Sequence, residues 1–197
     1  MISGDGRITS ELNRRIGMAS ADFATLSRIW NHSNLTRLDK VEIYQVLILS
    51  KLLYGLETTW LSAVERRKLD GFHCRCLRRF AGIRPAYWSR ITNKGVLDRF
   101  AAQSLSSLLL QRQLNYLGKL ARLPSTSSLR ALVFQPNSVL LSKSSASRRR
   151  GRPRLNWNTE VYRHALMVCE NQYQLENVIM DGCRWKTMVR EYCRLLR

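Results

Sequence analysis

The sequence predicts a mostly α-helical protein, in which a helical bundle is followed by a basic, partly ordered linker and a small C-terminal helical segment. Through most of the chain, apolar residues recur every three or four positions, which is the spacing of one face of an α-helix. Between Pro124 and Pro153 this spacing gives way to a serine-rich, basic stretch without acidic residues, which is typical of a linker. We therefore expect three parts, over residues 1–123, 124–155 and 156–197.

Three long helices are expected in the first part, over residues 9–31, 36–55 and 62–82. Thr36 precedes Asp39 by three positions, and the same spacing separates Ser62 from Glu65. This spacing allows a capping box, in which the two residues bond each other's backbone and start a helix. The most apolar stretch, 44–56, is too short to span a membrane and contains a lysine, so we expect a buried helix there.

The other expected elements are shorter. Thr92 is placed to cap a helix over 92–102, and residues 104–123 form an amphipathic helix with leucines on one side and cations on the other. One helical turn is expected within the linker, around residues 129–134. Helical spacing returns in two C-terminal stretches, 158–170 and 183–196.

The charge of the chain is strongly positive and unevenly distributed. The net charge is +19 and the pI is near 10.7. Residues 81–157 hold 14 basic residues and one acid, Asp98, and therefore carry +13 of this charge. Such an excess indicates a nucleic acid as partner, with an acidic membrane surface as the second candidate. RNA, DNA and an RNA–DNA hybrid all fit the charge, and we expect no membrane partner.

The cysteines and the N-terminus indicate the compartment. There are five cysteines, an odd number, and the first residues lack the apolar segment of a secretion signal. Free thiols persist in reducing compartments. We therefore expect a nuclear or cytoplasmic protein that is not secreted.

No set of residues predicts an active site. No two acids are adjacent or separated by one residue, as two-metal catalysis would favour, and there is no phosphate-binding loop or nucleophile elbow. His73, Cys74 and Cys76 lie close together, but their spacing on a helix does not direct them at one zinc ion. We expect a buried Cys76 beside an exposed His73, with no catalytic residue, metal or cofactor.

An arginine run is the most basic feature of the sequence. Its members are Arg148, Arg149, Arg150, Arg152 and Arg154, around a Gly-Arg-Pro core. The run could be a nuclear address, a hook in an AT-rich minor groove, or a sequence-independent phosphate contact. It could also be a solvated loop, although the surrounding positive charge favours binding.

Other candidate binding residues lie on the predicted helices. Arg78 and Arg79 could reach phosphates or face solvent at the end of one helix. Three further cations line the polar side of the amphipathic helix: Arg112, Lys119 and Arg122. Trp157 could stack on a base, but an anchor at a helix start that packs into the core is the favoured interpretation.

Several segments together resemble one family. They are "DGRITSELNRRIGMASADFATLSRIW", "LSKLLYGLETTWLSAVERRKLDGFHCRCLRRFAGI", "ITNKGVLDRF", "RQLNYLGKLARLP", "RRRGRPRLNW" and "DGCRWKTMVREYC". In this order they resemble the region C-terminal to the palm in LINE-type (non-LTR) retrotransposon reverse transcriptases. The resemblance extends from about Gly4 to Cys193. The family often has Gly-His where this chain has Gly118-Lys119.

The resemblance implies a thumb and C-terminal region. The whole family protein carries an endonuclease and a palm with a Tyr/Phe-Ala-Asp-Asp motif, which would precede these residues. The catalytic aspartates are absent from this sequence, so polymerase activity is implied for no residue here. A thumb grips the template–primer by its phosphates and needs apolar helices with basic outer faces.

We therefore expect a nucleic-acid-binding C-terminal fragment of a reverse transcriptase, which grips template–primer or target DNA without catalytic residues of its own. Two alternatives stay open. One is an independent small DNA-associated protein that uses the Arg-Gly-Arg-Pro core as a minor-groove hook. The other is a non-functional retrotransposon remnant.

Overall fold

The computed structural model describes residues 8–31, 34–142, 156–169 and 171–196 and confirms the mostly α-helical class. No strand occurs in these ranges, where an isolated bridge joins Phe134 and Leu141. The chain divides into two compact units, of which unit 1 comprises residues 1–55 and 61–106, and unit 2 comprises 56–60 and 107–197. The boundary therefore falls inside a helix, whereas the sequence pattern places it near residue 123.

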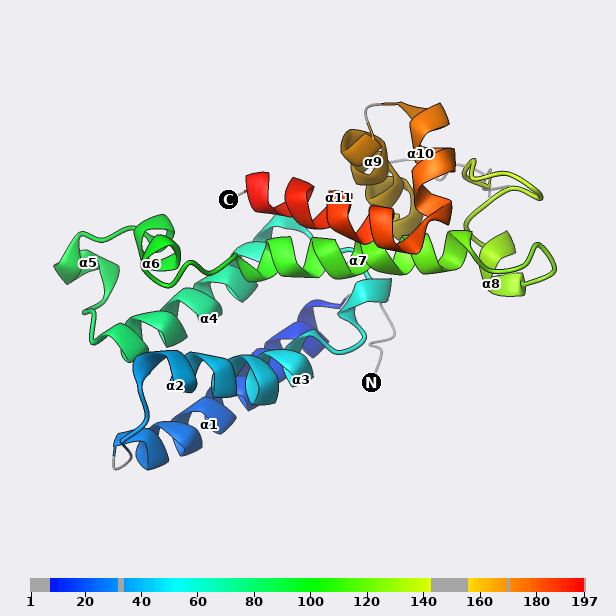
Figure 1. The fold of residues 1–197 in the computed structure, drawn as a ribbon. Helices are drawn as coiled ribbons and strands as arrows, with labels where there is room; N and C mark the ends of the chain where they lie inside the picture. The colour runs from blue at the N-terminus through cyan, green and yellow to red at the C-terminus, as the bar shows by residue number, and fades with distance from the viewer. Residues whose placement is uncertain (1–7, 32–33, 143–155, 170, 197) are drawn as a thin grey trace. The chain divides into compact units, whose positions relative to one another are not determined.

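Unit 1 begins with α1 (Thr9–Asn31), which buries an apolar stripe that includes Leu12, Phe23 and Trp30. Figure 1 shows α1 running alongside the helices that follow it, α2 (Arg37–Tyr44) and α3 (Ser50–Leu53). The predicted capping box of Thr36 and Asp39 starts α2.

A π-helical turn, η1 (Gln45–Leu49), joins α2 to α3 within one continuous helical segment. A π turn places one extra residue in the helix and so changes which side chains face the core. Ile48 and Leu49 are buried, while Val46 and Leu47 are exposed. Val46 and Leu47 are therefore exceptions within the buried helix predicted over 44–56, because that prediction assumes an unbroken α-helical period.

The next helix, α4 (Ala63–Ala81), starts at the predicted capping box of Ser62 and Glu65. It ends where Gly82 takes the left-handed conformation, with φ of 66°, which glycine adopts without steric cost. Two short helices follow, α5 (Ala86–Ser89) and α6 (Asn93–Arg99). Thr92 caps α6 as predicted, by accepting a hydrogen bond from the backbone N–H of Gly95.

The core of unit 1 is aromatic. The ring of Phe23 lies 5.7 Å from Trp30, 5.8 Å from Tyr44 and 5.3 Å from Phe80, between ring centroids and in edge-to-face geometry. These contacts join α1, α2 and α4. Edge-to-face pairs contribute about 0.5–1.5 kcal/mol each beyond the area that they bury.

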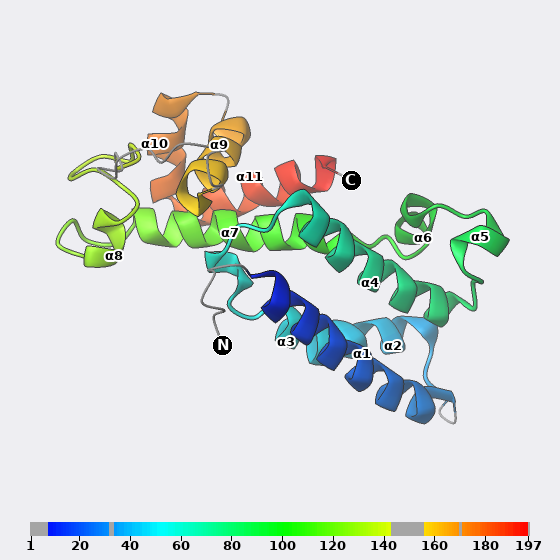
Figure 2. The same cartoon turned by 180° about the vertical axis from the view of Figure 1, so that it is seen from behind.

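Unit 2 contains the short helix η2 (Leu56–Thr58) and most of α7 (Leu105–Ala121). Its other helices are α8 (Ser128–Ala131), α9 (Trp157–Cys169), α10 (Gln172–Met180) and α11 (Gly182–Leu195). Trp185 of α11 is fully buried, and its indole N–H donates to the carbonyl of Leu114 in α7 at 2.9 Å. Figures 1 and 2, from opposite sides, both show α11 lying along α7.

The first half of the predicted linker packs into the core of unit 2. Val133, Phe134 and Val139 are buried in its apolar cluster. Arg130 is also buried, donates to the carbonyls of Ala121 and Ser138, and lies over the ring of Phe134. Val133, Phe134 and Val139 make this contact with the core, although serine and basic residues dominate the composition of the predicted linker. The predicted helical turn is present as α8.

No helix in the described part of the chain combines the length and the apolar character that a membrane span requires.

Candidate nucleic-acid interface

A groove of about 630 Å³ lies in unit 1, between α1, the second half of α4 and the segment that leads into α6. Arg75, Arg78 and Arg79 line it, together with apolar and small polar residues, and no acid is among the described residues of its wall. The spacing of Arg75 and Arg79 places them one helical turn apart on the same face of α4. The groove is therefore a positively charged hollow without a neutralising carboxylate in its wall.

Arg78 has a structural role in this groove. It is buried, and its guanidinium donates to the carbonyl of Ile91 at 2.6 Å and, at 3.3–3.4 Å, to the carbonyl of Arg84, the hydroxyl of Ser89 and the amide oxygen of Asn93. One acceptor precedes α5, one is its last residue, and two follow it. We therefore remove Arg78 from the predicted phosphate contacts, because its donors are already used to hold this segment.

Arg79 is exposed, as a phosphate-binding residue must be. Its guanidinium carbon lies 5.6 Å from the centroid of the Phe23 ring, a cation–π contact that orients the side chain. A second hollow, of about 370 Å³, adjoins Arg79 and includes Lys40 and Trp30 in its wall. Arg79 thus contributes to two neighbouring basic hollows on unit 1.

Two acids of α4 accept hydrogen bonds from other groups of the protein. Asp70 accepts hydrogen bonds from the backbone N–H and the hydroxyl of Ser106, at 2.8 and 2.7 Å. Glu65 accepts from the hydroxyls of Thr9 and Ser62, at 2.6 and 2.8 Å. Burial alone raises the pKa of Glu65, but these hydrogen bonds outweigh it and hold the pKa below its ordinary value. Arg75 and Arg79 of α4 are exposed, whereas these carboxylates are bonded to groups within the fold.

Two aromatic residues beside the groove escaped the sequence analysis. Tyr87 and Trp88 of α5 are 78% and 70% exposed, among the largest exposures of apolar side chains in the described residues. Their neighbours Arg84, Arg90 and Lys94 are exposed as well. Two adjacent aromatic residues among basic residues were the signal that the sequence offered.

The cations predicted on α7 differ in their surroundings. Arg112 and Lys119 are exposed and, seven positions apart, lie on one face of the helix. Arg122 is half-buried and donates to the carbonyl of Ile179 at 2.6 Å, so it ties α7 to the end of α10. Arg122 is therefore another structural arginine, whereas Arg112 and Lys119 remain candidate phosphate contacts on unit 2.

The arginine run, Arg148 to Arg154, lies outside the described residues. Trp157, just after it, starts α9 and packs against the core of unit 2. Its indole N–H donates to the carbonyl of Glu57 at 2.7 Å, and its ring meets Tyr116 edge-to-face at 5.8 Å. The predicted core anchor is confirmed for Trp157.

His73, Cys74 and Cys76 form a buried polar patch inside unit 1. His73 is 2% exposed, contrary to the prediction, because Tyr44 stacks on its ring and the Tyr44 hydroxyl bonds its Nδ1 at 3.0 Å. Burial lowers the pKa of His73 to about 4 and raises that of Cys76 to about 12, so both are neutral near pH 7. Within the described ranges, no three His, Cys, Asp or Glu side chains converge as metal ligands.

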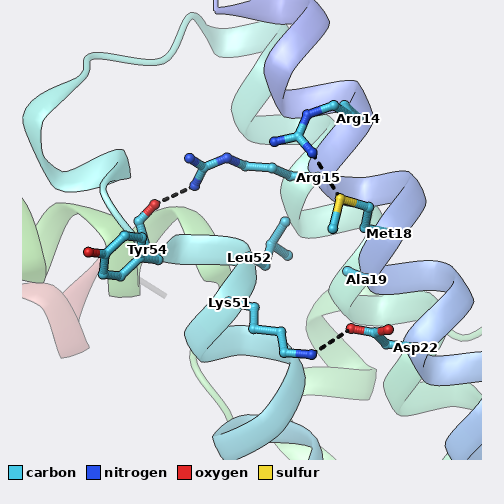
Figure 3. Close-up of a pocket in the computed structure, with 8 residues that line it drawn as sticks. All are labelled: Arg14, Arg15, Met18, Ala19, Asp22, Lys51, Leu52 and Tyr54. Carbon is cyan, nitrogen blue, oxygen red and sulfur yellow. Dashed lines mark hydrogen bonds and ion pairs between the residues drawn. The ribbon is translucent and has the colours of Figure 1, made fainter. Parts of the chain in front are cut away.

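In another hollow, of about 190 Å³ between α1 and α3, the positive charges of the wall are paired with groups of the protein itself. Figure 3 shows Lys51 paired with Asp22, at 3.2 Å, and Arg15 donating to the carbonyl of Tyr54. Arg14 and Arg15 also pair with Glu11. Its cations have partners within the protein, so the groove beside α4 is the better candidate for an anionic ligand.

Comparisons with family models, with curated proteins and with solved structures find no match to this chain.

Proposed function

We propose that this chain binds nucleic acid through its phosphates, as the thumb and C-terminal region of a LINE-type reverse transcriptase. The observation that carries the proposal is the groove beside α4, where Arg75 and Arg79 lie exposed and no acid lines the wall among the described residues. A phosphate backbone presents regularly spaced negative charge to such a groove. The resemblance to the retrotransposon family supports the same function and supplies its context.

The proposed contacts are independent of sequence. Arginines that approach phosphates fix the position of a duplex or a single strand but do not read its bases. Arg112, Lys119 and the run from Arg148 to Arg154 would add further phosphate contacts. Polymerase chemistry belongs to palm aspartates, which no residue of this sequence supplies, so the role of this chain is to hold template–primer or target DNA.

The test is the salt dependence of binding to a mixed-sequence DNA duplex and to an RNA–DNA hybrid. The test variant carries Arg75→Ala and Arg79→Ala. The control carries Arg190→Ala and Arg194→Ala, which removes the same charge from exposed arginines with the same spacing on α11. Each phosphate contact adds about 0.9 to the slope of log affinity against log salt. We expect the groove variant to flatten this slope by about 1 to 2, and the control to leave it nearly unchanged.

Equal slopes in the two variants would mean that total charge, and not the groove, governs binding. No binding by the unmodified protein at about 0.05 M salt, where phosphate contacts are strong, would refute the function itself. Circular dichroism melting of each variant checks that both remain folded.

A further inference from the structure

The most exposed aromatic pair of unit 1 lies beside the proposed phosphate groove. Tyr87 and Trp88 are consecutive residues of α5, and their ring centroids lie 5.4 Å apart at an interplanar angle of 88°. Pro85 and Ala86, which precede them, form part of the wall of the groove. Two large rings are thus presented to solvent directly beside the cationic hollow.

The backbone that carries the two rings is firmly supported. The buried guanidinium of Arg78 holds the carbonyl of Arg84 before α5 and the carbonyl of Ile91 after it. The hydroxyl of Ser89 accepts from Arg78 and also from the backbone N–H of Ile91. Arg90 follows α5 in the left-handed conformation, with φ of 56°, which is uncommon in a residue other than glycine. The backbone on both sides of the two rings is therefore held by hydrogen bonds.

The surroundings of the rings are cationic. Residues 84–99 include one exposed acid, Asp98, and four exposed basic residues: Arg84, Arg90, Lys94 and Arg99. An apolar protein partner or a lipid surface could also cover two aromatic rings. The positive charge around them, together with the groove next to them, favours a ligand that offers both flat apolar rings and negative charge, which is a nucleic acid.

Only unpaired bases can stack on the rings of Tyr87 and Trp88. Bases inside a duplex are stacked on each other, whereas bases of a single strand, an overhang or a frayed end expose faces that aromatic side chains can cover. We infer that Tyr87 and Trp88 stack on unpaired bases of a strand whose phosphates lie on the arginines of the groove. This inference rests on the proposed nucleic-acid-binding function and adds to it a preference for single-stranded ends.

The experiment compares binding of three DNA probes: a single-stranded oligo(dT) of about 20 nucleotides, a blunt duplex of similar length and the same duplex with a 3′ overhang. The test variant is Tyr87→Ala with Trp88→Ala. Tyr87→Phe with Trp88→Phe keeps the rings. The control is Tyr173→Ala, which removes a side chain of matched exposure, 79%, from α10 in unit 2.

The alanine variant should lose about tenfold or more in affinity for the single strand and for the overhang, since the unpaired bases would lose the aromatic rings on which they stack. Blunt-duplex binding and the salt slope should not change, because no charge is removed. The phenylalanine variant should retain most of the affinity, and the Tyr173 control should behave as the unmodified protein.

Unchanged single-strand binding in the alanine variant, with duplex binding intact, would overturn the stacking platform and leave the proposed function standing. An equal loss on all three probes would also overturn it, because the rings would then serve the fold. The alanine variant is also tested for binding to phosphatidylserine vesicles. If vesicle binding is lost while single-strand binding is unchanged, the aromatic pair belongs to a membrane surface and the inference is rejected.

Discussion

At the scale of the residue, Gly118 shows how one missing methyl group sets the packing of unit 2. A Cβ atom at this position would lie 2.5 Å from two ring atoms of Trp185. Trp185 is fully buried and its indole N–H donates to the carbonyl of Leu114, so a shift of its ring would disturb this hydrogen bond. Glycine is normally disfavoured inside a helix, and here the close approach of the indole explains its presence in α7.

Gly118→Ala should therefore destabilise the protein, although alanine is the better helix former by about 1 kcal/mol. Overpacking of a core costs about 1–3 kcal/mol, which outweighs that gain. The matched control is Gly17→Ala in α1, where a Cβ would meet no atom within 4 Å and helix propensity alone should raise stability. Urea unfolding measures both variants, and stabilisation by Gly118→Ala would contradict the packing described for Trp185.

At the scale of the element, the end of α4 and the helices after it depend on a single buried side chain. Arg78 connects α4 with the segments on both sides of α5 through four acceptors. Two of these are backbone carbonyls that no helix satisfies. Arg78 therefore holds the backbone segment that carries Tyr87 and Trp88. A sequence pattern alone does not distinguish Arg78 from the exposed arginines around it.

Arg78→Ala should lower the free energy of unfolding by about 2–3 kcal/mol, because it removes all the hydrogen bonds of one buried, charged guanidinium to the segment 84–93. Arg78→Lys should recover little, since an ammonium cannot reach several acceptors that a planar guanidinium spans. Arg75→Ala, at an exposed position of the same helix, is the control and should change stability by less than about 0.5 kcal/mol. Hydrogen exchange of residues 84–93 should accelerate in the Arg78 variants alone, and unchanged protection there would refute its anchoring role.

At the scale of the whole molecule, positive charge is the property that the two units have in common. Residues 81–157 carry most of the positive charge, and they include the groove segment of unit 1, the cations of α7 and the arginine run. The run was predicted to be a nuclear address, to bind phosphates, to enter an AT-rich minor groove or to be a solvated loop. Binding experiments on the intact chain distinguish these possibilities.

Replacing Arg148, Arg149, Arg150, Arg152 and Arg154 with alanine should flatten the salt slope of duplex binding by about 2 to 4, if most of the run meets phosphates. An unchanged slope would remove the run from the binding surface. A preference of the unmodified protein for AT-rich over GC-rich duplex and over hybrid, lost in this variant, would favour the minor-groove hook. A non-cooperative melt by circular dichroism would support the remnant hypothesis.

The sequence by itself determined the helical class, both capping boxes and the cap at Thr92. Each of these depends on contacts between residues near one another in the chain, or on an apolar period that repeats along it. The excess of positive charge is likewise a property of composition alone.

Only the tertiary structure decided which arginines are free to bind. Arg78, Arg122 and Arg130 satisfy carbonyls from other segments, while Arg75 and Arg79 remain exposed, although all five are equally basic in the sequence. The burial of His73 and the packing of half the predicted linker were also decided there. These outcomes depend on contacts between different segments, some near in the chain and some far apart, and the apolar period along one helix carries no information about such contacts.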